Sequence, residues 1–173
     1  DIEEMKESVD ALIELVERPK AEEYRDLFWV IKGRAPLIAR FAAENQTVER
    51  EILSCSELDK MLYKNMRIIK GRVAEGVKVK FITPFDKKNA AVYRAWIDAG
   101  VQIRVFDTVK FGLLPRIAIF DGKKGRLTVG IPEVRNEEDY ITLWTESKAF
   151  SVMLRNQFMH MWRSAKPIQK YLD

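Results

Sequence analysis

The sequence predicts an α/β fold in which helices flank a mixed β-sheet. Two observations support this prediction: short β-branched runs alternate with helical periodicity from residue 27 to residue 106, and a hairpin pattern follows. The 173 residues suffice for one domain that buries roughly 70% of the surface of its unfolded chain. A hydrophobic content of 47% excludes a disordered chain. No apolar run reaches the ~20 residues of a membrane span.

Residues 1–18 predict an amphipathic helix that ends at Pro19. Its apolar residues recur at alternating spacings of three and four, which is the a/d pattern of a coiled coil. The residues on this stripe are Ile2, Met5, Val9, Leu12 and Val16. We therefore expect a coiled-coil helix that joins two copies of the chain as a homodimer. The alternative is a helix that lies on its own domain.

The next part of the chain, which we expect to form one domain over residues 26–165, begins with alternating strands and helices. The expected strands are 27–31, 48–55, 77–82 and 101–106, and the expected helices are 36–45, 56–75 and 87–99. Ser56 is expected to cap the second of these helices. This alternation with short connections predicts a parallel sheet with helices on its faces.

The second half of that domain predicts antiparallel strands and a final helix. Strands are expected at 114–121, 126–131 and 140–145, with a glycine turn between the first two. Lys123, Lys124 and Arg126 are expected at a charged hairpin tip. Ser147 is expected to cap the last helix, whose apolar residues recur at helical spacing.

The numbers of cysteine and histidine residues and the net charge exclude several kinds of functional site. Cys55 is the only cysteine and His160 the only histidine, which excludes an intrachain disulfide and a zinc site with several Cys and His ligands. We expect a cytoplasmic protein with no metal and no cofactor. The net charge of +4 is too small and dispersed to indicate nucleic-acid binding by itself.

Several segments together resemble the effector domain of the archaeal TrmB-type transcriptional regulators. They are residues 28–34 (FWVIKGR), 76–79 (GVKV), 142–147 (TLWTES) and 158–165 (FMHMWRSA). The heptad helix matches the linker that joins a winged helix-turn-helix domain to this effector domain in the family. The resemblance covers nearly the whole chain, and it implies a phospholipase D-like fold. Because the chain begins at Asp1 without methionine, we expect a DNA-binding domain that these 173 residues do not contain.

The resemblance also implies that catalysis has been lost. Phospholipase D enzymes use the pattern His-x-Lys-x4-Asp, in which the histidine attacks phosphorus, and each site needs two such motifs. If Asp121 is the aspartate of the pattern, Arg116 stands in the lysine position and Leu114 in the histidine position. His160 lies in the last predicted helix and cannot replace the missing nucleophile. We therefore expect a protein that is not an enzyme.

Candidate effector-binding residues come from two sources. Ser54, Cys55, Thr83 and Asp107 lie at the carboxyl ends of three predicted strands, where ligands bind in open α/β folds. Arg116 and Asp121 are candidates for a residual anion or polar-ligand site. Each of these residues has a plainer alternative as a core, turn, capping or ion-pair residue.

The sequence thus predicts the effector-sensing and dimerisation domain of a TrmB-like regulator. DNA would be bound through the absent domain, and a sugar or another metabolite would be the effector. Two alternatives remain open. One is a phospholipase D-like phosphodiesterase or nuclease. The other is a stand-alone phosphate- or nucleotide-binding module, although the sequence has neither a GxGxxG nor a GxxxxGK[ST] loop.

Overall fold

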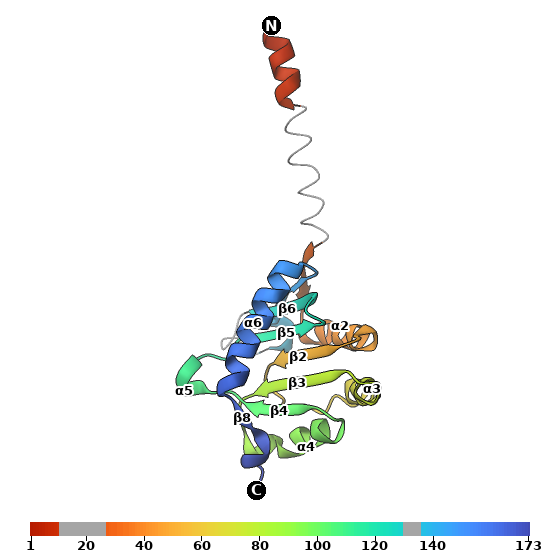
Figure 1. The fold of residues 1–173 in the computed structure, drawn as a ribbon, viewed down its shortest axis with the longest axis vertical. Helices are drawn as coiled ribbons and strands as arrows, with labels where there is room; N and C mark the ends of the chain where they lie inside the picture. Colours follow the sequence, from red (N-terminus) through yellow and green to blue (C-terminus); the bar gives the residue numbers. More distant parts are fainter. Residues whose placement is uncertain (11–26, 130–135) are drawn as a thin grey trace.

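A mixed sheet of eight strands forms the centre of the computed structural model, which describes residues 1–10, 27–129 and 136–173 (Figure 1). The α/β class predicted from the sequence is confirmed. The strand order in the sheet is β1-β7-β6-β5-β2-β3-β4-β8. The strands are β1 (Phe28–Lys32), β2 (Glu51–Cys55), β3 (Lys78–Thr83), β4 (Gln102–Val105), β5 (Arg116–Phe120), β6 (Lys124–Val129), β7 (Ile141–Thr145) and β8 (Lys166–Pro167).

Only the middle of the sheet is parallel. β2, β3 and β4 pair in parallel, whereas β5, β6, β7 and β1 continue the sheet on one side as antiparallel strands. The expectation that the first strand belongs to the parallel series is wrong. β1 lies at the sheet edge, antiparallel to β7, with Trp29 opposite Trp144. The two indole rings lie 6.5 Å apart, and this contact between distant parts of the chain stabilises the edge position.

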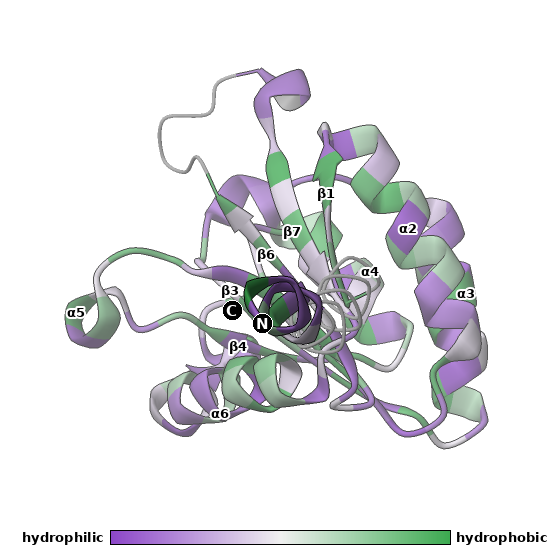
Figure 2. Ribbon diagram, turned by 90° about the horizontal axis from the view of Figure 1, so that it is seen from above, coloured by the Kyte–Doolittle hydropathy of each residue, from purple (hydrophilic) through white to green (hydrophobic). Residues whose placement is uncertain are grey.

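Helices cover both faces of the sheet (Figures 1 and 2). In Figure 2, α2 and α3 lie on one side of the strands and α6 lies on the other. The longer helices are α2 (Arg34–Thr47), α3 (Tyr63–Ala74), α4 (Ala90–Asp98) and α6 (Lys148–Ser164). The short ones are α5 (Thr108–Phe111) and the 3-10 turns η1 (Lys87–Asn89), η2 (Glu137–Asp139) and η3 (Ile168–Lys170).

The two faces of the sheet form two hydrophobic cores because side chains alternate along each strand. On β5, Ile117 and Ile119 pack with residues of α6, whereas Ala118 and Phe120 belong to the core beneath α2, α3 and α4. The central strands are buried on both faces, as is usual for the parallel part of an α/β sheet. The face under α2 and α3 contains the pocket described below.

The last helix begins where the sequence predicts. Ser147 Oγ accepts a hydrogen bond from the backbone N–H of Phe150 (3.2 Å), so the predicted N-cap is confirmed. Gly125 on β6 lets α6 pack closely on the sheet. A Cβ at this position would lie 2.9 Å from the carbonyl oxygen of Ala118 and 3.2 Å from a methyl group of Leu154.

The prediction that a helix begins at Ser56 is wrong, because α3 begins only at Tyr63. The backbone N–H of Ser56 donates instead to the carbonyl of Ile82 (3.1 Å), which prolongs the pairing of β2 with β3. The backbone N–H of Leu58 donates to Thr83 Oγ1 (3.2 Å). Residues 56–62 therefore form a loop over the end of the sheet, and we call them the 56–62 loop.

The chain adds further structure after α6 that the sequence did not suggest. Arg104 and Val105 of β4 pair with β8, and Ile168 in the following turn is fully buried in the core beneath α4. The fold thus extends a few residues beyond the expected end at residue 165.

The N-terminal segment is helical over residues 2–10, apart from the sheet (Figure 1). Ile2, Met5 and Val9 of the predicted dimerisation stripe are exposed in the single chain. Leu12 and Val16 lie outside the described residues. Within the described ranges, no helix has both the length and the apolarity needed to cross a membrane.

Candidate functional site

A pocket of about 110 Å³ lies between the sheet and helices α2 and α3, beside the 56–62 loop. Its size approaches that of the ~150 Å³ cavity that is known to hold benzene in another protein. Aromatic and aliphatic side chains from α2, β3, α4 and β5 supply much of its lining, including Phe41, Phe81, Trp96 and Phe120. Polar side chains complete the lining, and most of them come from strand ends and the loop.

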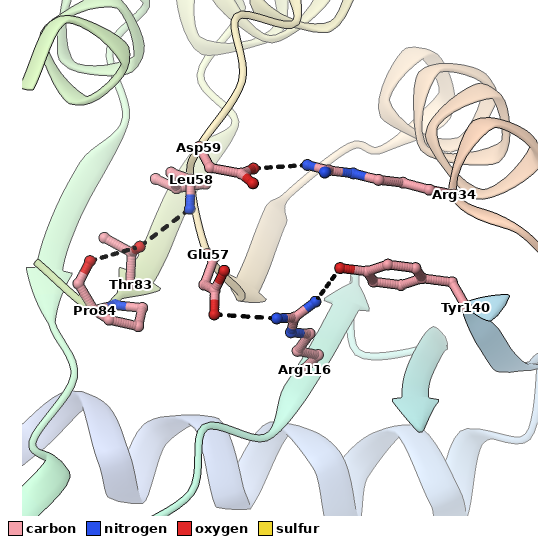
Figure 3. Close-up of polar contacts among 8 residues, drawn as sticks. All are labelled: Arg34, Glu57, Leu58, Asp59, Thr83, Pro84, Arg116 and Tyr140. Atoms are coloured by element: carbon pink, nitrogen blue, oxygen red, sulfur yellow. Dashed lines mark hydrogen bonds and ion pairs between the residues drawn. The ribbon is translucent and has the colours of Figure 1, made fainter. Parts of the chain in front are cut away.

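Ion pairs connect the 56–62 loop to the rest of the pocket (Figure 3). Asp59 Oδ1 lies 2.7 Å from Arg34 Nη2 at the start of α2. Glu57 Oε1 lies 3.1 Å from Arg116 Nη2 at the start of β5. Arg116 Nη1 also donates to the hydroxyl of Tyr140 (2.7 Å). These two ion pairs therefore hold the 56–62 loop in place, and the residues that form them also line the pocket.

Thr83 holds the 56–62 loop through a hydrogen bond to its side chain. Its side chain is fully buried at the end of β3. The hydroxyl accepts the N–H of Leu58 (3.2 Å) and donates to the carbonyl of Pro84 (3.1 Å), so its hydrogen-bonding capacity is used within the protein (Figure 3). Thr83 does not line the pocket, and its contact with the loop is its part in the site.

The structure separates the other two candidates on the parallel strands. Ser54 lines the pocket on β2. Its neighbour Cys55 points to the opposite face and is fully buried in the core under α6. Burial raises the pKa of the Cys55 thiol to about 12, although Arg126 and Arg116 oppose the shift. Cys55 is therefore a neutral core thiol at physiological pH.

The remaining aspartate candidates make local backbone contacts. Asp107 caps α5 by accepting the N–H of Lys110 (3.0 Å). Asp121 accepts three backbone N–H groups, from Glu49 (2.9 Å), Arg50 (2.7 Å) and Glu51 (2.9 Å). Arg116 and Asp121 stand at opposite ends of β5, so the structure does not bring them together in one site.

The only histidine lies away from the pocket. His160 is exposed on α6, and its ring contacts the edge of Phe111 at 5.4 Å between ring centres. It does not line the pocket. Over residues 1–10, 27–129 and 136–173, no group of three or more His, Cys, Asp and Glu side chains could hold a metal ion.

The pocket residues that sequence reasoning missed include Arg126, Glu57, Asp59 and Tyr140. Arg126 was expected at a solvated hairpin tip, but its side chain is buried on β6 and lines the pocket. The alternation of Arg126 with the apolar Leu127 was a signal that one of them faces a core. For Glu57 and Asp59, the expected helix concealed the fact that they lie on a loop.

The strand order and the helices on both faces define a phospholipase D-like fold. The structure of Nuc from Salmonella typhimurium, a phospholipase D family member, superposes with a TM-score of 0.59 and 12% identity over 81% of this chain and 97% of Nuc. NucT from Helicobacter pylori gives 0.59 and 14% over 81% of this chain and 98% of NucT. The predicted fold class is thus confirmed.

A structure of TrmBL2, an archaeal chromatin protein with a novel mode of DNA binding, superposes with a TM-score of 0.62 and 19% identity. The match covers 95% of this chain and 63% of TrmBL2, so the chain spans less than two thirds of that protein. No protein-family model matches the chain, and no curated protein sequence matches it. At such identities these likenesses establish the fold, and membership of the TrmB-like family stays a prediction.

Proposed function

We propose that this chain is the effector-binding and dimerisation part of a DNA-binding transcriptional regulator, and that it binds a small molecule without catalysing a reaction on it. The pocket beside the 56–62 loop is the observation on which this proposal depends. Its apolar walls and few polar groups are typical of small-molecule sites. The lysine position of the phospholipase D pattern, here Arg116, lies at this pocket.

The regulatory part of the proposal is supported by two further observations. TrmBL2 is a DNA-binding chromatin protein with the same fold. Residues 2–10 form a helix whose apolar stripe is exposed in the single chain. A ligand that binds one arrangement of the 56–62 loop more tightly would shift the population of that arrangement. In a dimer, such a shift would change the spacing of the attached DNA-binding domains.

The proposed lack of catalysis is supported by the side chains at the pocket. Leu114 stands where the pattern requires a nucleophilic histidine. His160 is exposed on α6, which packs on the opposite face of the sheet. The hydroxyls of Ser54, Ser56 and Tyr140 line the pocket, but activation of a hydroxyl requires a base beside it. The carboxylates of the pocket, Glu57 and Asp59, are instead paired with Arg116 and Arg34.

Two assays on the purified chain test this proposal. A thermal-shift screen with sugars, nucleotides, organic acids and phosphorylated metabolites should find compounds that raise the Tm by several degrees. Bis-p-nitrophenyl phosphate, a general phosphodiester substrate, should not be hydrolysed above background. Hydrolysis that is lost in the variant His160→Ala would instead establish the alternative function, a phospholipase D-like phosphodiesterase. If no compound of any class stabilised the chain, the effector role would be wrong.

A further inference from the structure

Arg126 is a buried cation that has no carboxylate partner among the described residues. Its residue is 3% exposed, on the strand β6. Its hydrogen bonds run from Nη1 to Thr128 Oγ1 (2.7 Å) and to the carbonyl of Arg116 (3.3 Å), both of which are neutral acceptors. Its Nε has no hydrogen-bond partner within the described residues. None of the ion pairs in the described part of the chain includes Arg126.

Such an arrangement opposes folding. Removal of a guanidinium from water has a large free-energy penalty unless an opposite charge offsets it. The ring of Phe41, 5.1 Å from the guanidinium carbon, provides only a weak cation–π attraction. Burial lowers the pKa of Arg126 to about 9, so the side chain is still charged at neutral pH. A buried charged residue with a perturbed pKa that lines a pocket is a candidate functional residue.

A counter-ion of Arg126 could lie in the pocket. Arg126 lines it together with Phe41, Phe120 and Ala118, so its charge is next to the apolar wall. Arg34, Lys60 and Arg116 also line the pocket. Arg34 and Arg116 are paired with Asp59 and Glu57, and Lys60 is exposed on the loop and has an interaction of its own. Among the described residues, Arg126 is therefore the buried pocket cation that lacks a carboxylate. The two carboxylates of the loop disfavour anions of higher charge.

We propose that the pocket binds a small organic monocarboxylate, whose carboxylate pairs with Arg126 and whose apolar body lies against Phe41, Phe81 and Trp96. An arginine fork matches the two oxygens of a carboxylate, and the aromatic walls match a branched aliphatic or aromatic body. This inference rests on the proposed effector function and specifies the chemical class of the effector. A phosphate dianion fits less well, because it would require Arg116 to leave Glu57.

The experiment compares charged probes with neutral isosteres in thermal unfolding at constant ionic strength. Benzoate, phenylacetate and isovalerate are tested against benzamide, phenylacetamide and isovaleramide, with inorganic phosphate as a further arm. At least one carboxylate should raise the Tm by several degrees, whereas its amide and phosphate should not. In Arg126→Met, which retains most of the apolar volume, the carboxylate should no longer raise the Tm.

The ligand-free variants provide a second readout. Arg126→Met should unfold at or above the Tm of the wild type, since it removes a buried charge without a partner. Arg155→Met is the matched control. Arg155 is ion-paired with Glu51 at 2.6 Å and does not line the pocket, so this variant should lower the Tm and keep the response to the carboxylate.

Three results would overturn the inference. Unfolding of Arg126→Met well below the Tm of the wild type would make Arg126 a structural residue. Stabilisation by phosphate or by the amides, with none by the carboxylates, would leave the effector function standing and refute the monocarboxylate. A carboxylate response that survives in Arg126→Met would refute the role of Arg126.

Discussion

At the scale of the residue, Asp121 was predicted as a ligand-binding residue, but its carboxylate accepts hydrogen bonds from the backbone instead. Asp121 adopts φ 54°, the left-handed conformation that aspartate and asparagine tolerate better than most residues. Partial burial raises the pKa of Asp121, but the backbone N–H donors of Glu49, Arg50 and Glu51 and the charge of Arg50 outweigh this and lower it below 3.8. The charged carboxylate therefore fastens the start of β2 to the turn that follows β5.

We expect Asp121→Asn to lower the free energy of unfolding by about 1 kcal/mol at neutral pH, a value discounted because the group is partly exposed. Asparagine keeps the left-handed backbone, so the loss reflects charge and hydrogen bonding. Because the folded-state pKa is lowered, the contribution of Asp121 is present above the unfolded-state value of 3.8 and is lost as the pH falls through the folded-state value. Urea unfolding from about pH 7 to about pH 2.5 should show the two proteins converging.

Asp107→Asn is the matched control for this prediction, since Asp107 accepts a single N–H, that of Lys110, in a short helix. It should change the stability less than Asp121→Asn does. Equal stability of Asp121→Asn and the wild type at neutral pH would contradict the capping role, as would a difference that stays constant down to low pH.

At the scale of the element, the 56–62 loop depends on one buried hydroxyl. Thr83→Val keeps the shape of the side chain but removes the acceptor of the Leu58 N–H. An unpaired donor at a partly buried position costs about 1–3 kcal/mol, so we expect a lower Tm and faster opening of the loop. Hydrogen exchange at the Leu58 amide should accelerate in Thr83→Val and stay slow in Thr83→Ser, which keeps the hydroxyl. Unchanged protection in Thr83→Val would show that other contacts hold the loop.

The same loop shows where sequence reasoning reaches its limit. Strands and helices were predictable where hydrophobic periodicity decides them, as in α6 with its Ser147 cap. Ser56 carries the signal of an N-cap equally well, yet its N–H pairs with Ile82 and the helix begins at Tyr63. Contacts between residues 25 positions apart, such as Leu58 with Thr83, override this local signal.

The candidate site was predictable only in part for a similar reason. Ser54 lines the pocket near the carboxyl end of β2, where ligands bind in open α/β folds. Arg116, a candidate from the phospholipase D pattern, lines it at the start of β5. Cys55 adjoins Ser54 in sequence but belongs to the other core, because successive side chains of a strand point to opposite faces. Arg126 lies in the pocket because β6 pairs with β5 in a register that places it opposite Ala118. That register is a property of the folded sheet.

At the scale of the whole molecule, the helix of residues 2–10 exposes an apolar stripe. Ile2, Met5 and Val9 are 84%, 68% and 52% exposed in the single chain. A second copy of the helix would bury this apolar surface. A short helix of this kind is only marginally stable when isolated, so association would stabilise it. In the proposed regulator, this segment joins two ligand-binding domains.

We therefore expect light scattering after size exclusion to give twice the chain mass of 20.2 kDa for the wild type and a single chain mass for the double variant Met5→Glu, Val9→Glu. Carboxylates at a and d positions would have to be buried against each other in the dimer, whereas they remain solvated in the monomer. Lys6→Glu is the control, because it changes the net charge by the same amount off the stripe and should remain a dimer. A monomeric wild type at micromolar concentration would contradict dimerisation. A double variant that remains a dimer would place the interface on the domain, and the pocket would then have to communicate through a surface other than this helix.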